Sequence, residues 1–143
     1  MKAVIVSLSL FLASLVAVSA FAGDTPSAEG AEVYIINLSD GDRVKSPVLV
    51  QFGLRGMGVA PAGVPDLANT GHHHLVIDEK VEGRELDLPL PKNDKHIHFG
   101  GGQTEAMVEL APGEHTLTLV LADWTHTPHS PPVISKPIRI VVE

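Results

Sequence analysis

Short stretches in which apolar and polar residues alternate recur along this chain from Glu32 onward, and turn sequences separate them. Alternation with a period of two is typical of β-strands that bury one face. The clearest stretches are residues 48–54, 115–121 and 138–142. We therefore predict an all-β domain over residues 32–143, a single immunoglobulin-like antiparallel β-sandwich of about seven strands.

Proline marks the expected interruptions of this pattern. Residues 86–91 contain two prolines and are expected to form an edge or an irregular segment, because proline cannot donate a hydrogen bond to a sheet. Residues 124–132 contain three prolines and are expected to form a loop. Residues 133–142 would then close the domain as its last strand.

The N-terminus has the features of an export signal. Lys2 precedes an apolar run over residues 3–18, and Ala20 and Ala22 fit the small-x-small pattern of a cleavage site. We predict a cleaved signal peptide over residues 1–22 and a flexible lead-in over residues 23–31. A retained membrane anchor is the alternative, but the run is shorter than the roughly 20 residues that span a bilayer. The mature chain is expected to be periplasmic or secreted, with no membrane span.

The composition excludes several kinds of site. The chain has 17 Asp and Glu against 10 Lys and Arg, a formal charge of −7, so it gains nothing from counterion release on DNA or RNA. Nucleic-acid binding is therefore not expected. The chain has no Cys, so it can form no disulfide and offers no thiolate to a metal. A metal site would have to use His, carboxylate or Met side chains.

Histidine is the residue type that says most about function. All eight lie in the predicted domain, and seven form three groups: His72, His73 and His74; His96 and His98; His126 and His129. In a strand, residues i and i+2 share a face. His72 and His74 are therefore expected together on the outer face of a sheet, with His73 turned toward the core. The second group gives another same-face pair, and the third lies in the proline-rich loop.

Neutral imidazole binds Cu, Zn, Ni and Fe, and a site needs three or four such ligands. We predict a metal site whose ligands come from six histidines, in the order His96 and His98, then His72 and His74, then His126 and His129. Copper is the preferred ion, because Cu(II) binds most tightly among the divalent ions, and zinc is second. Met57 offers a thioether for Cu(I), although packing at the end of the sandwich is its favoured role.

Two other features have simpler interpretations. His115 stands alone in the sequence and is interpreted as a scaffold residue. The run Gly100-Gly101-Gly102 lacks the Lys and the spacing of a phosphate-binding loop. It is expected to bring the backbone close to the strand of His96 and His98.

Three stretches together resemble a known family. They are residues 71–78 (GHHHLVID), residues 96–105 (HIHFGGGQTE), and residues 112–117 (PGEHTL) leading to His126, His129 and Val133. In this order they resemble the bacterial domain of unknown function 4399, over roughly Val33 to Val142. The resemblance implies a small exported or periplasmic bacterial domain. It implies no activity, because the family name records none.

Three functions remain open from the sequence. The first is a periplasmic protein that binds, buffers or delivers copper or zinc, with another periplasmic protein as a candidate partner. The second is a metal-free immunoglobulin-like interaction or structural module whose histidines are hydrogen-bonded scaffold residues. The third, ranked last, is a metalloenzyme with three His ligands, an open position and a general acid or base such as Glu105. Paired imidazoles that converge on one point would favour metal.

Overall fold

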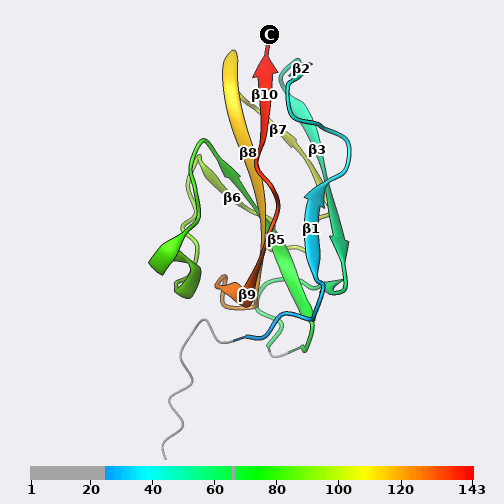
Figure 1. Cartoon of the computed structure of the whole chain (residues 1–143), viewed down its shortest axis with the longest axis vertical. Coiled ribbons are helices and arrows are strands. Elements are labelled where there is room, and N and C mark those ends of the chain that lie inside the picture. The colour runs from blue at the N-terminus through cyan, green and yellow to red at the C-terminus, as the bar shows by residue number, and fades with distance from the viewer. Residues whose placement is uncertain (1–24, 66) are drawn as a thin grey trace, which may run out of the picture.

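The computed structural model of the chain describes residues 25–65 and 67–143, so the predicted signal peptide lies outside the described residues. Two β-sheets make up the fold (Figure 1). The smaller sheet has the order β1-β3-β7, formed by β1 (Glu32–Ile35), β3 (Val48–Arg55) and β7 (Glu105–Val108). Within the described ranges there is no α-helix, and no helix there is long and apolar enough to cross a membrane.

The larger sheet has seven strands. Its main path is β2 (Asp42–Val44), β10 (Ile138–Val142), β8 (Gly113–Ala122), β5 (Thr70–Ile77) and β4 (Gly58–Val59). In addition, β6 (His96–His98) pairs with β5, and β9 (Pro128–Ile134) pairs with β8. The prediction of an all-β chain is confirmed, and the two sheets are consistent with a sandwich. The immunoglobulin-like connectivity stays a prediction.

The core lies between the two sheets and follows the predicted alternation. From β3 it takes Val48, Val50 and Phe52, and from β8 it takes the fully buried Leu117, Leu119 and Leu121. Ile140 and Val142 of β10 complete the same layer. Each of these sets has a spacing of two residues, because alternate side chains of a strand point to the same face.

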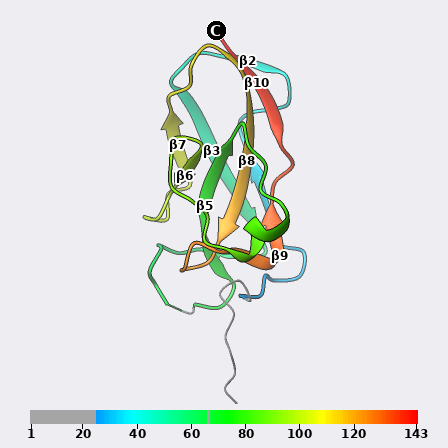
Figure 2. The ribbon, with the colours of Figure 1, turned by 90° about the vertical axis from the view of Figure 1, so that its left-hand side faces the viewer.

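The larger sheet also buries part of its outer face, which the sequence pattern did not predict. A second apolar cluster forms there from Val76, Leu90, Val120 and Ala122. Leu90 belongs to the segment that follows β5, which includes the short 3-10 helix η1 (Gly83–Asp87) and lies over this face (Figure 2). As a result β5 is buried on both faces from Gly71 to Ile77.

Two predicted details of the strands are wrong. The expected loop at residues 124–132 ends early, because β9 begins at Pro128 and pairs with β8 through Pro128, Val133 and Ile134. The ladder is irregular there, with a register shift between Leu121 and Ala122, which accommodates prolines that cannot donate. Two strand pairs, β2–β10 and β4–β5, are parallel rather than antiparallel.

The described part of the predicted lead-in contacts β9. The backbone N–H of Ser27 donates to Ser130 O at 3.2 Å, and the N–H of Ser130 donates to Thr25 O at 3.0 Å. Residues 25–27 are thereby hydrogen-bonded along β9.

Candidate metal centre

The His72–His74 run lies on β5, in the middle of the larger sheet, where its side chains alternate as expected. The ring of His73 points into the core, with its centroid 5.2 Å from that of Phe52. His72 and His74 point to the outer face, but their side chains are only 0% and 1% exposed. The segment between β5 and β6, called the covering segment below, and the neighbouring loops therefore enclose these two polar side chains. Without them the outer face would leave both rings in water.

His98 joins this pair from the neighbouring strand. The antiparallel register of β5 and β6 places His98 directly opposite His74. Residues opposite each other in an antiparallel ladder point to the same face, so His98 faces the space above His72 and His74. Its ring centroid lies 4.9 Å from that of His72 and 5.1 Å from that of His74.

His126 reaches the same space from the loop between β8 and β9. Its backbone has φ of 71°, a left-handed conformation that few non-glycine residues adopt. Its ring centroid lies 4.6 Å from that of His98 and 5.1 Å from that of His72. The carbonyl of His126 accepts a hydrogen bond from the N–H of Leu90 at 2.9 Å, which ties the loop to the covering segment.

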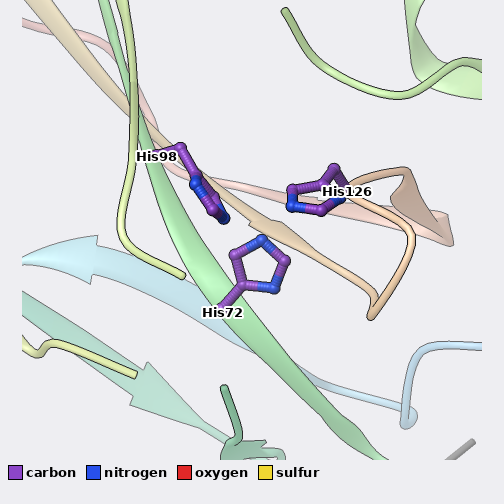
Figure 3. A group of neighbouring side chains, drawn as sticks. All are labelled: His72, His98 and His126. Atoms are coloured by element: carbon purple, nitrogen blue, oxygen red, sulfur yellow. The ribbon is translucent and has the colours of Figure 1, made fainter. Parts of the chain in front are cut away.

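Three of these imidazoles could hold a metal ion. His72, His98 and His126 each offer one ring nitrogen, and the three atoms all lie within 4.8 Å of one another. Figure 3 shows the three rings around a common space, reached from two strands and a loop. His74 lies at the edge of this group, with its Nε2 atom 2.9 Å from Nε2 of His72. Three convergent ligands are the minimum for a typical metal site.

The loop that carries His126 is built around Asp123. Its Oδ1 atom accepts hydrogen bonds from the N–H groups of Thr125 and Thr127 and from the Thr125 hydroxyl, at 2.6–3.1 Å. Its Oδ2 atom accepts a hydrogen bond from the Thr25 hydroxyl at 2.6 Å. Burial raises the pKa of Asp123, but these hydrogen bonds outweigh it and hold the pKa below its usual value. An ionised carboxylate with hydrogen bonds to both oxygens therefore fixes the shape of the loop.

Several ring nitrogens in and around the group are buried without a hydrogen-bond partner among the described residues. They are Nδ1 of His72, His74 and His96, Nε2 of His73 and His98, and both nitrogens of His129. Buried polar atoms are normally hydrogen-bonded, and an exception in a native structure calls for a ligand, a water or an ion. The Nε2 atom of His98, which belongs to the convergent group, is the exception that an ion would explain most directly.

The surroundings favour neutral imidazole. Burial first, and then the neighbouring rings of His98 and His126, lowers the pKa of His72 to about 4. Burial and the surrounding histidines lower the pKa of His74 to about 2, and burial also lowers the pKa of His98. A neutral imidazole keeps a free lone pair, which is the form that binds metal.

The two other predicted ligands lie outside this group. His96 is on the same face as His98, but its Nε2 atom lies 2.9 Å from Oε2 of Glu79. His129 is buried on β9, and its Nε2 atom lies against the backbone of Gly71. No second group of three potential ligands occurs in the described part of the chain. A ligand role for His96 or His129 therefore stays a prediction.

The other residues that the sequence analysis considered also lie outside the convergent group. His115 fits the scaffold interpretation, because Nε2 donates to Ala111 O at 2.8 Å and Nδ1 lies 2.8 Å from Oδ2 of Asp78. Met57 packs against the main core. Glu105 is exposed on β7, where it accepts a hydrogen bond from Gln51 at 3.0 Å.

The sequence analysis did not single out Asp123. The short spacing of Asp123, Thr125 and Thr127 was the available signal, because such residues bond to nearby backbone in turns. It gave no indication of the contact between Thr25 and Asp123, which joins residues 98 positions apart.

Comparison with known proteins identifies the family. No relative among the curated proteins and no solved structure matches the chain. A family model described as a domain of unknown function matches residues 50–143, which include all eight histidines. The chain therefore belongs to the family of domain of unknown function 4399.

Proposed function

We propose that this protein is an exported metal-binding protein that holds one ion at His72, His98 and His126. The convergence of three ring nitrogens within 4.8 Å carries the proposal. These residues come from β5, β6 and the β8–β9 loop, so the fold assembles the group from distant parts of the chain. Surface histidines with no common role have no reason to converge in this way.

Copper is the preferred ion and zinc is the alternative. Among the divalent ions Cu(II) binds most tightly to imidazole ligands, and zinc also accepts them. The Nε2 atoms of His72 and His74 are 2.9 Å apart and form a hydrogen bond in the metal-free chain. A change of tautomer would free both nitrogens for one ion, so His74 is proposed as the fourth ligand.

The proposed role is binding, buffering or delivery of the ion in the periplasm, with another periplasmic protein as donor or acceptor. Signal-peptide cleavage after Ala22 and an immunoglobulin-like connectivity of the sandwich are parts of the same proposal. A metalloenzyme is not favoured, because Glu105, the acid or base considered for it, is exposed on the smaller sheet.

The test is metal binding by residues 23–143 produced without a His tag, measured with Cu(II), Cu(I) and Zn(II). We expect one equivalent of tightly bound ion, and loss of that binding in His98→Ala. The matched control is His96→Ala, which removes a histidine from the same strand and face but leaves the convergent group intact. Equal loss in both variants, or no tight binding by the unmodified chain, would overturn the proposal.

A further inference from the structure

A pocket lies next to the metal centre at the end of the sandwich where β5 begins. Its volume is about 240 Å³. Its wall includes Ala60, Pro61, Val64, Leu67, Trp124 and His72. Pockets for drug-sized ligands have volumes of about 300–1,000 Å³, so this one suits a smaller molecule.

The pocket and the metal centre are built from adjoining parts of the chain. His72 belongs to both, since its ring is one of the three convergent imidazoles and the residue, although fully buried, lies in the wall of the pocket. Asp123 and Trp124, which begin the loop that carries His126, line the pocket as well. An occupant would therefore lie next to the residue that supplies one proposed metal ligand and next to the base of the loop that presents another.

The chemistry of the wall favours a neutral ligand with an apolar body. Most of the lining side chains are apolar, and burial of apolar surface drives binding to such a wall. Asp123 is the charged side chain in the described part of the wall, and hydrogen bonds from Thr25, Thr125 and Thr127 already engage both of its oxygens. With three hydrogen bonds at Oδ1 and one at Oδ2, the carboxylate is largely satisfied by the chain itself.

The mouth of the pocket is unusually apolar for a protein surface. The side chains of Val64, Leu67 and Trp124 all line it and are 40%, 55% and 44% exposed. Exposed apolar side chains that gather around one cavity are typical of binding sites.

We propose that this pocket binds a small neutral organic molecule with an apolar body, held by the apolar wall next to His72 and the metal centre. The inference deepens the proposed function and rests on it for the ion, whereas the apolar pocket is observed independently of any metal. Because the ligand and the ion share His72, each changes the affinity of the other.

The test uses Trp124, the single Trp of the chain, as a fluorescent reporter in the wall of the pocket. The probe is 4-ethylpyridine, and pyridine is its matched control without the apolar extension. Titrations are made on residues 23–143, with and without Cu(II), by fluorescence and by calorimetry. We expect the probe to bind about tenfold more tightly than pyridine, as two additional buried carbons predict, and to bind with a different affinity when Cu(II) is present.

Two variants separate the pocket from general apolar binding. Leu67→Ala removes a side chain of the wall and is expected to weaken binding of the probe several-fold. Leu88→Ala is the matched control, because Leu88 is 56% exposed against 55% for Leu67 but lines a different pocket. Equal affinity for the two pyridines, or equal effects of the two variants, would overturn the pocket proposal.

The outcomes also distinguish the two proposals. Probe binding without any metal binding would contradict the metal centre and leave the pocket standing. Tight metal binding with no response to the probe would contradict the pocket and leave the metal centre standing. Binding of the probe with an affinity that Cu(II) leaves unchanged would overturn the coupling between the pocket and the metal centre.

Discussion

Gly100 lies directly against the imidazole of His98. A Cβ atom at position 100 would overlap Cε1 and Nε2 of that ring, and it would lie 3.3 Å from Cβ of Ala62. The carbonyl of Gly100 also accepts a hydrogen bond from the N–H of Ala62 at 2.9 Å, which holds the backbone in place. The absence of a side chain at Gly100 is thus what allows His98 to occupy its position in the convergent group.

The first prediction follows from this contact. Gly100→Ala should weaken metal binding by about 10–100-fold, the usual effect of losing a group that orients a metal ligand. The fold should survive, because the φ of Gly100 lies outside the left-handed region. Isothermal titration with Cu(II) and Zn(II) measures the affinity, and circular dichroism checks the fold.

Gly101→Ala is the matched control for this substitution. A Cβ at Gly101 would meet only the flexible side chain of Gln103, at 3.1–3.3 Å. Metal affinity should therefore stay close to that of the unmodified chain. If both variants bind equally well, Gly100 has no role in placing His98.

The second prediction concerns the stability of the metal-free chain in acid. Because the folded-state pKa values of His72 and His74 lie far below 6.5, the unfolded chain binds more protons than the folded chain as the pH falls below 6.5. The free energy of unfolding should therefore decrease by about 1.4 kcal/mol per pH unit for each of these groups. For His72 the decrease should continue to about pH 4, and for His74 to about pH 2. Urea unfolding in the presence of EDTA, at a series of pH values, measures this slope.

His74→Leu provides the comparison. It removes one group that must be neutral to be buried and replaces it with an apolar side chain beside Val76 and Val120, which are also fully buried. The dependence of stability on pH should become shallower, with a loss of about 1 kcal/mol at pH 7 because Nε2 of the buried His72 loses its hydrogen-bond partner. An unchanged slope would show that His74 is not what opposes folding in acid.

Much of the fold could be predicted from local patterns of residues. The alternation in residues 48–54 placed Val48, Val50 and Phe52 in the core, and the spacing of two placed His73 opposite in direction to His72 and His74. β9 was missed because three prolines suggest a loop, whereas the strand lies at an irregular part of the ladder.

The metal centre could be predicted only in part. Spacing identified the pairs His72 with His74 and His96 with His98. It could not show which member of a pair lies next to the histidines of the other strand and the loop. The register of β5 and β6 decides this, because it sets His98 opposite His74 and leaves His96 opposite Val76, where Glu79 is its partner. Neither the register nor the position of the covering segment has a local signal in the sequence.

The third prediction concerns the loop that carries His126. Asp123→Ala removes the acceptor of four hydrogen bonds and leaves the buried N–H of Thr127 without its bond to the carboxylate. The free energy of unfolding should fall by about 3 kcal/mol, and metal affinity should fall at least tenfold because His126 loses its fixed position. Chemical unfolding and Cu(II) titration measure the two effects.

Thr25→Val isolates the outer contact of the same carboxylate. It removes only the hydroxyl that donates to Oδ2 of Asp123 and leaves the bonds to Oδ1 in place. Stability should fall by about 1 kcal/mol, with metal affinity nearly unchanged. A large loss of metal binding in this variant would mean that residues 25–27, rather than Asp123 alone, position His126.

The last prediction concerns His115, whose effect on stability has the opposite dependence on pH. Burial lowers the pKa of His115, but its hydrogen bonds to Asp78 and Ala111 outweigh this and raise the pKa above 6.5. Its protonated form is therefore more favourable in the folded chain. The stabilisation should be complete below pH 6.5 and should be lost as the pH rises through the folded-state pKa.

The comparison of the unmodified chain with His115→Gln should show a difference in unfolding free energy of about 1 kcal/mol at pH 5.5. The difference is small because Asp78 is partly exposed to water. That difference should shrink by pH 8.5, and one that grows with pH would contradict the assigned pairing.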